Sequence, residues 1–174
     1  GAAAYFLSDD FGSAKVLCSE FFNRISPEVN ALQKMLSSLF GYLLLGKKFQ
    51  IINDMPTGER VCYLLLSYYT TGEGLDEIQN FLPDFRKEIY ENDNPMEIFY
   101  IDVLYAVILM ALSKSTWRLL PHYSGLEPSL WSSYLKSQQA TKMLWSAQQL
   151  IGENGILSGQ SAVVQLPTGV GKTK

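Results

Sequence analysis

A glycine-rich run near the end of the sequence carries the residues best suited to chemistry. Its letters are Leu166, Pro167, Thr168, Gly169, Val170, Gly171, Lys172, Thr173 and Lys174. The backbone N–H groups of such a turn surround a phosphate, the lysine reaches the outer phosphates, and the threonine hydroxyl suits Mg²⁺. The run therefore predicts a phosphate-binding loop over residues 167–173. Lys172 and Thr173 are its catalytic candidates, and Thr173 is also the candidate metal ligand.

The segment before this run should hold the loop in place. Residues 161–166 begin with small and β-branched residues and stand before a turn, which is typical of a strand. A turn at residues 152–155 and a short linker at 156–160 separate this strand from what precedes it. A helix should follow the loop with its N-terminus facing the phosphate, and it would begin at about the last residue given.

The sequence of the loop is more specific than the general phosphate-binding motif. The strict pattern has a glycine where this sequence has Leu166. Leu-Pro-Thr-Gly-Val-Gly-Lys-Thr resembles motif I of superfamily 2 helicases. In that family a glutamine ahead of the first strand reads the adenine of ATP, a task that suits an amide because it both donates and accepts.

Gln148, 24 residues before Lys172, stands where the resemblance expects the adenine-reading glutamine. Gln149 is its neighbouring competitor, and an exposed helix residue is the alternative for Gln148. Trp145 would pack near the base or support Gln148, or else be a plain core residue. The wording around these residues is most similar to Ski2-like or related DExH helicases, including those of bacterial defence systems. The similarity covers only residues 144–174.

The resemblance implies ATP and Mg²⁺ as cofactors of a parent motor that grips DNA or RNA. The acidic motif, the arginine fingers and the second RecA-like lobe of such a motor are not among the 174 residues. Phosphoryl transfer needs several of these parts together, so we expect no ATPase activity and negligible nucleotide affinity from this polypeptide alone. The strand at 161–166 would have no sheet to join, and should either lie loosely or pair with a second copy in a dimer.

The rest of the sequence predicts helices separated by short breaks. The fold class expected is mainly α: an irregular bundle of about seven to nine helices, then one strand and the phosphate-binding loop, which begin a truncated RecA-like α/β domain. Residues 1–140 would be an accessory helical domain and 141–174 the start of the RecA-like domain. Apolar spacing and cap residues place the helices at 13–25, 26–46, 59–70, 75–81, 84–90, 96–112, 114–120, 128–135 and 138–151.

Composition limits what the helical domain does. Apolar residues make up 47% and charged residues 18%, so the chain is globular, and its net charge of −3 argues against a strong grip on nucleic acid. A protein partner, or bracing of the motor, is the better expectation. Cys18 and Cys62 have no metal-ligand spacing, which favours buried free thiols in a cytoplasmic protein. No signal peptide is visible, and the apolar stretch around Asp102 is predicted to be a buried helix rather than a membrane span.

Two other functions stay open from the residues alone. The chain could be a helical interaction module fused to another class of phosphate-loop NTPase, or a self-standing helical domain with an incidental loop. An acidic Asp-Glu-x-His or Asp-Glu-Ala-Asp box after Lys174 would favour the helicase. Further polar groups are better explained as solvated surface: Asp9, Asp10, residues 88–93, and the set Lys114, Arg118 and His122.

Overall fold

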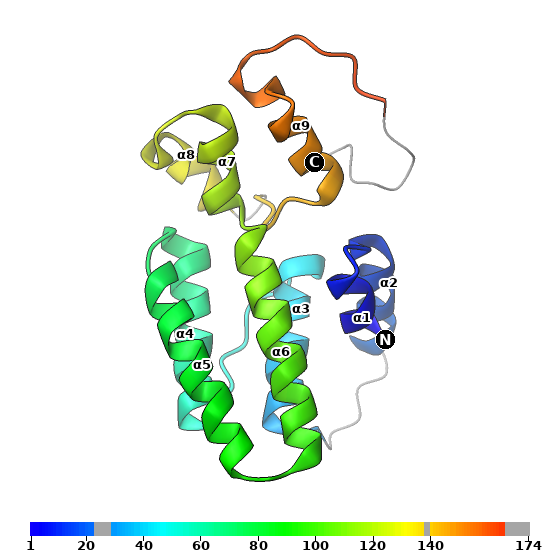
Figure 1. Cartoon of the computed structure of the whole chain (residues 1–174), viewed down its shortest axis with the longest axis vertical. Helices are drawn as coiled ribbons and strands as arrows, with labels where there is room; N and C mark the ends of the chain where they lie inside the picture. The colour runs from blue at the N-terminus through cyan, green and yellow to red at the C-terminus, as the bar shows by residue number, and fades with distance from the viewer. Residues whose placement is uncertain (23–28, 138–139, 166–174) are drawn as a thin grey trace. The chain divides into compact units, whose positions relative to one another are not determined.

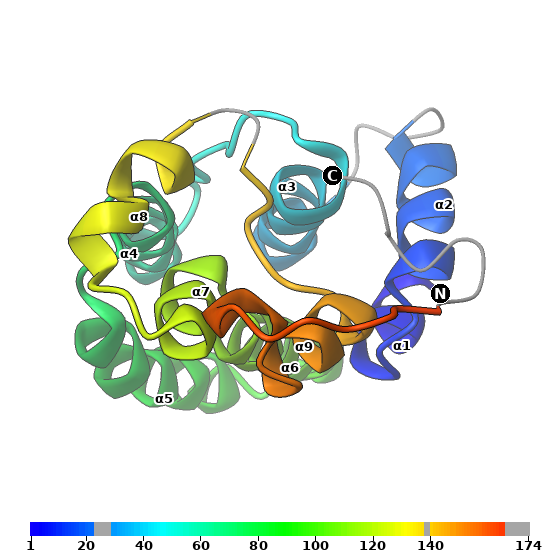
Figure 2. The same cartoon turned by 90° about the horizontal axis from the view of Figure 1, so that it is seen from above.

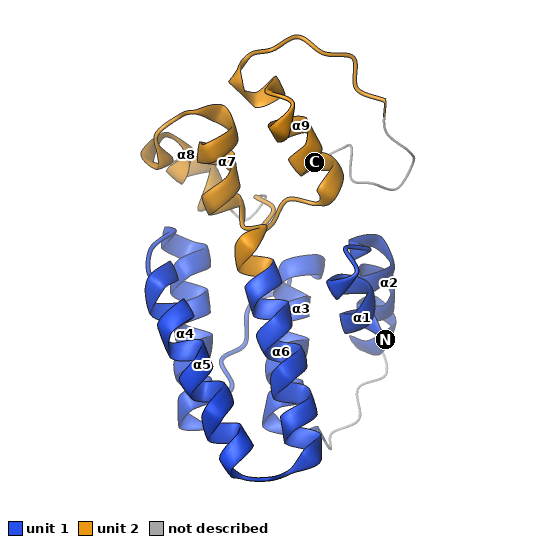
Figure 3. Ribbon diagram, viewed as in Figure 1, with its two compact units in different colours: residues 1–110 blue, residues 111–174 orange. Residues whose placement is uncertain are grey.

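The chain is helical wherever its structure is described. The computed structural model describes residues 1–22, 29–137 and 140–165, and within them it has nine α-helices, one short 3-10 helix and no sheet (Figure 1). This confirms the mainly α class and the expected number of helices. The chain divides into two compact units, Gly1–Met110 and Ala111–Lys174 (Figure 3).

The first unit is built from six helices. They are α1 (Ala2–Leu7), α2 (Phe11–Phe22), α3 (Ala31–Leu45), α4 (Pro56–Thr71), α5 (Leu75–Glu91) and α6 (Pro95–Ser113), the last of which runs three residues into the second unit. Helices α1 and α2 form a hairpin that packs on α3 through α2, and α4 lies between α3 and α5 (Figures 1 and 2). Helix α1 was not predicted.

Large apolar side chains fill the core of this unit. Phe6, Phe85, Ile89, Ile101 and Ile108 are each completely shielded from solvent. Burial of one such side chain stabilises the fold by about 1.5–3 kcal/mol. The core therefore draws on helices at both ends of the unit.

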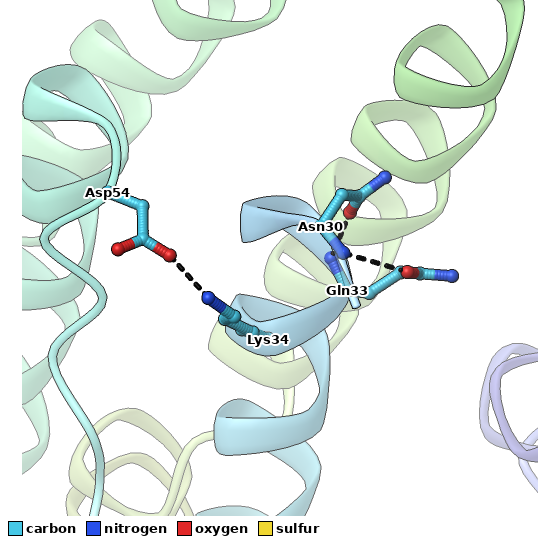
Figure 4. A network of polar contacts seen from close by, with 4 residues as sticks. All are labelled: Asn30, Gln33, Lys34 and Asp54. Atoms are coloured by element: carbon cyan, nitrogen blue, oxygen red, sulfur yellow. Dashed lines mark hydrogen bonds and ion pairs between the residues drawn. The ribbon is translucent and has the colours of Figure 1, made fainter. Parts of the chain in front are cut away.

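Helix α3 begins later than the sequence pattern predicted. The expected start at Ser26 and Pro27 lies outside the described residues, and α3 itself starts at Ala31. Asn30 is its N-cap: the Asn30 side chain accepts from the N–H of Gln33 at 2.8 Å, and the Gln33 side chain accepts from the N–H of Asn30 at 3.1 Å (Figure 4). This reciprocal pair satisfies two N–H groups that a helix start leaves free. One turn on, Lys34 pairs with Asp54 from the segment before α4 (Figure 4).

Helix α5 is one helix where the sequence predicted two short ones. Pro83 lies inside it and removes the N–H that would bond to the carbonyl of Gln79. Both residues are exposed, so water can satisfy that carbonyl. The buried residues of α5 lie both before and after Pro83 in the sequence: Ile78, Leu82, Phe85 and Ile89. Their packing outweighs a proline cost of about 3 kcal/mol.

Helix α6 is apolar on all sides but buried on only one. Its inner face is in the core, whereas Met96 and Phe99 are each 58% exposed. By length and composition α6 is the one helix among the described residues that could cross a membrane. In this structure Asp102, near its middle, accepts from the Arg86 guanidinium of α5 and from the Tyr90 hydroxyl, each at 2.7 Å. The hydrogen bond from Arg86 is the main reason why the pKa of Asp102 lies below its usual value.

The two cysteines are free and buried, as the sequence predicted. Burial raises the pKa of Cys18 to about 11 from 9.0, and burial also raises the pKa of Cys62. Because the thiolate is the reactive form, this shift lowers the reactive fraction of Cys18 about a hundredfold below pH 9.

We therefore expect neither thiol of the native chain to react rapidly with a disulfide reagent at pH 8. In guanidinium chloride, both thiols should react with the reagent within the period in which the native chain does not. Cys18→Ser and Cys62→Ser variants assign each slow phase to its thiol. A thiol that reacts in the native protein as fast as in denaturant would show that its site is open to solvent.

The second unit contains three further α-helices. They are α7 (Thr116–Ser124), α8 (Pro128–Leu135) and α9 (Ser146–Glu153), followed by the 3-10 turn η1 (Ile156–Ser158). The bounds of α8 match the prediction. Helix α7 continues past Pro121, where the sequence predicted a stop, and ends at Gly125 in the left-handed conformation. The hydroxyl of Ser124 donates to the Leu120 carbonyl at 2.7 Å and accepts from the Trp131 indole at 3.0 Å, which links α7 to α8.

Candidate functional site

An extended connector leads directly to the predicted adenine-reading residue. The N–H of Leu144 donates to the Lys114 carbonyl at 2.8 Å, and the N–H of Thr116 donates to the Lys142 carbonyl at 3.2 Å. Ser115 and Met143 form an antiparallel bridge between these two bonds. We call residues 114–116 and 141–144 the clasp. It joins the end of α6 and the start of α7 to the residues just before α9.

One side-chain hydrogen bond closes the clasp. The Thr116 hydroxyl donates to the Thr141 carbonyl at 2.8 Å, and Thr116 is 2% exposed. Ser115 is fully buried, and no partner lies within hydrogen-bond distance of its hydroxyl in the described part of the chain. Burial also lowers the pKa of Lys142. The clasp is therefore buried at Ser115, Thr116, Met143 and Leu144 and partly exposed at Lys114, Thr141 and Lys142.

The clasp explains why the last predicted helix is too long at its start. The sequence pattern placed a helix over 138–151, but α9 runs only over Ser146–Glu153. Residues 138 and 139 lie outside the described chain. The carbonyls of Thr141 and Lys142 and the N–H of Leu144 bond to residues 114–116 instead of to a helix. Tertiary pairing thus overrides local propensity here.

Gln148 lies at the third position of α9. Its Oε1 accepts from the N–H of Trp145, the N-cap residue, at 2.9 Å. This is one half of a capping box, and the indole of Trp145 supplies no acceptor for the other half. Gln149, the competing candidate, donates from Nε2 to the Leu144 carbonyl at 2.8 Å. Gln149 therefore braces the clasp, while Gln148 caps the helix with its oxygen.

The far end of α9 rests on α7 through a glycine. A Cβ built on Gly152 would lie 2.2 Å from Cδ2 and 2.4 Å from Cγ of Tyr123. Only a residue without a side chain fits this approach. The Tyr123 hydroxyl also lies 3.5 Å from a carboxylate oxygen of Glu153. Burial, and then the charge of Glu153, raise the pKa of Tyr123.

The predicted strand is not formed in the part that is described. Residues 161–165 have no regular secondary structure and are exposed, with Val163 fully open to solvent. A strand needs a hydrogen-bonded neighbour, and no strand of the described chain lies beside this segment. The structure therefore shows no strand at residues 161–165, and the strand predicted over 161–166 stays a prediction.

The phosphate-binding loop itself falls outside the described residues. This applies to Leu166 and to the predicted nucleotide-binding residues Pro167, Thr168, Gly169, Val170, Gly171, Lys172 and Thr173. Within the described ranges, no group of three or more His, Cys, Asp or Glu side chains could hold a metal ion. Thr173 thus stays the predicted Mg²⁺ ligand, on the chemistry of its hydroxyl.

Sequence reasoning missed the polar residues that support Gln148. Thr116 and Thr141 belong to no motif and no apolar periodicity, and only the paired backbone reveals their connection. The adjacent pair Ser115 and Thr116 was a weak signal, since such residues often begin helices. Lys114 contributes its backbone carbonyl to the clasp, and this hydrogen bond to Leu144 does not depend on the charge of its side chain.

Comparison with protein-family models, curated proteins and solved structures finds no match for this chain. A functional assignment rests on the loop motif and on the residues around Gln148.

Proposed function

We propose that this chain is the N-terminal accessory domain and the start of the motor of an ATP-dependent nucleic-acid helicase or translocase of superfamily 2. The observation that carries the proposal is the motif Leu-Pro-Thr-Gly-Val-Gly-Lys-Thr at 166–173, with Gln148 placed 24 residues before Lys172. Residues 1–140 are the accessory part, and 141–174 begin a RecA-like domain whose first strand is residues 161–166.

The donor set fits a nucleotide with its Mg²⁺. Backbone N–H groups of 168–171 and the Lys172 ammonium would hold the phosphates, and the Thr173 hydroxyl would face the metal. When bound, ATP supplies the transferable phosphoryl group. The hydrogen bond from the Trp145 N–H to Gln148 Oε1 supports the role of Gln148, because it restricts the rotation of the side-chain amide.

The helical units fit the accessory role better than a nucleic-acid grip. Acidic residues outnumber basic ones by 17 to 14, and the basic Arg86 of α5 is already paired with Asp102. Phosphate contacts need unpaired, clustered lysine and arginine. DNA or RNA would therefore bind to the motor lobes, and the helical part would bind protein or brace the motor.

The segment at 161–165 supports the same proposal from another side. Two consecutive valines are exposed in this stretch, and β-branched residues of this kind suit a strand that a larger sheet buries. In a complete motor this strand would pair on both sides. Without those partners it is open to pairing with a second copy of the chain.

Two substitutions at Gln148 separate its two roles. In a longer protein that contains these residues and the motor, Gln148→Glu keeps an oxygen that caps α9 but removes the amide donor. We expect Gln148→Glu to weaken ATP binding about tenfold, the loss of one hydrogen bond to the base, with little change in thermal stability. Gln148→Ala should lose both the ATP affinity and the cap, at about 0.5–1 kcal/mol of stability.

Gln79→Glu is the matched control for the binding measurement, because it makes the same change of charge on the exposed face of α5, outside the proposed site. Titration with a fluorescent ATP analogue, beside thermal unfolding, measures both properties. Equal ATP affinity of the wild type and Gln148→Glu would remove Gln148 from the proposed site.

A further inference from the structure

Thr116, in the clasp, is linked to Gln148 through a series of hydrogen bonds. We propose, on the basis of the proposed function, that Thr116 is a positioning residue for the base-reading glutamine. Its hydroxyl bonds to the Thr141 carbonyl at 2.8 Å, four residues before the N-cap of α9. Thr116 thus acts through the backbone of 141–145.

The connection from Thr116 to Gln148 is continuous in hydrogen bonds. Thr116 holds Thr141 by its hydroxyl and Lys142 by its N–H, and the Lys114 carbonyl holds Leu144. The Leu144 carbonyl accepts from Gln149, and the Trp145 N–H donates to Gln148 Oε1. Each residue from 141 to 145, apart from the bridge residue Met143, is therefore fixed by a named bond.

Burial makes the Thr116 hydroxyl hard to replace. Thr116 is 2% exposed, so an apolar side chain in its place would put a methyl group where the hydroxyl donates to the Thr141 carbonyl and would remove that bond. Valine has nearly the same shape as threonine and would keep the packing while removing the donor. Serine would keep the donor and lose only a methyl group. The neighbouring Ser115 is equally buried, but its hydroxyl makes no hydrogen bond to the described residues.

These differences define a direct experiment with Thr116→Val, Thr116→Ser and the control Ser115→Ala. In the 174-residue chain, hydrogen exchange of the Gln148 and Gln149 amides should be about tenfold faster in Thr116→Val, because both donate to the Trp145 carbonyl. Thr116→Ser and Ser115→Ala should exchange like the wild type. The two conservative variants also show whether Thr116→Val is merely unfolded, since circular dichroism would then separate it from them.

The second readout is nucleotide choice in a longer protein with the motor. Thr116→Val should raise KM for ATP about tenfold with kcat within about twofold, and should reduce the preference for ATP over GTP. A uniform loss of folded protein would lower activity with both nucleotides alike and leave KM and the preference unchanged. Thr116→Ser should restore the wild-type values.

The outcomes are distinct. If the wild-type protein does not bind ATP, both the proposed function and the role of Thr116 fall. If the wild type binds ATP and Thr116→Val has the same KM, nucleotide preference and amide exchange, the proposed function stands and Thr116 has no positioning role.

Discussion

Gly152→Ala should destabilise the second unit by about 2 kcal/mol or more, although alanine is the better helix former. The alanine methyl group would lie 2.2–2.8 Å from three ring carbons of Tyr123. The ring cannot avoid this contact by turning about its own axis, because Cγ, at 2.4 Å, lies on that axis. Overpacking of this kind costs about 1–3 kcal/mol or more, which exceeds the gain of about 1 kcal/mol from replacing a helical glycine.

A double-mutant cycle with Tyr123→Ala tests the cause. Without the ring, Gly152→Ala should be neutral or stabilising, and urea unfolding of the four proteins gives the coupling. Gly12→Ala in α2 is the matched control, since a Cβ there would meet only Asp10 at an ordinary 3.7 Å. A Gly152→Ala chain as stable as the wild type would show that α9 does not rest on Tyr123.

The helix bounds show which parts of the fold the sequence could predict and which it could not. Apolar spacing placed α4, α6 and α8 close to their true bounds, because their local pattern and their packing agree. Prolines misled the prediction twice: Pro83 and Pro121 both lie inside helices whose buried faces run past them. Local sequence rules include the free-energy cost of a proline inside a helix, but not the tertiary packing that offsets this cost.

The candidate site was predicted by chemistry and not by geometry. Gln148 was predicted from the family resemblance, and the structure places it at the third position of α9 with its oxygen bonded to the Trp145 N–H. The clasp was missed because its bonds join residues that are about 25 positions apart in the sequence and carry no motif. The strand predicted over 161–166 is not shown at 161–165 for the opposite reason, since valine content gives propensity but a strand requires a partner.

Lys172→Ala should have the largest effect on ATP hydrolysis, measured in a longer protein that contains these residues and the motor. Lys172 is the only side chain of the loop whose charge would reach the outer phosphates, and no other cation of the motif can replace it. Loss of one such group typically lowers kcat roughly a hundredfold or more. The substitution should leave the stability of α1 to α9 unchanged, because none of these helices contains the loop.

ATP hydrolysis by a longer protein that contains these 174 residues and the motor, measured with and without DNA or RNA, tests the central proposal most directly. We predict hydrolysis that a nucleic acid stimulates, that Lys172→Ala abolishes, and that the neighbouring control Lys174→Ala retains. An ATP hydrolysis rate that nucleic acid does not raise, or that Lys172→Ala does not lower, would contradict the assignment to a superfamily 2 motor.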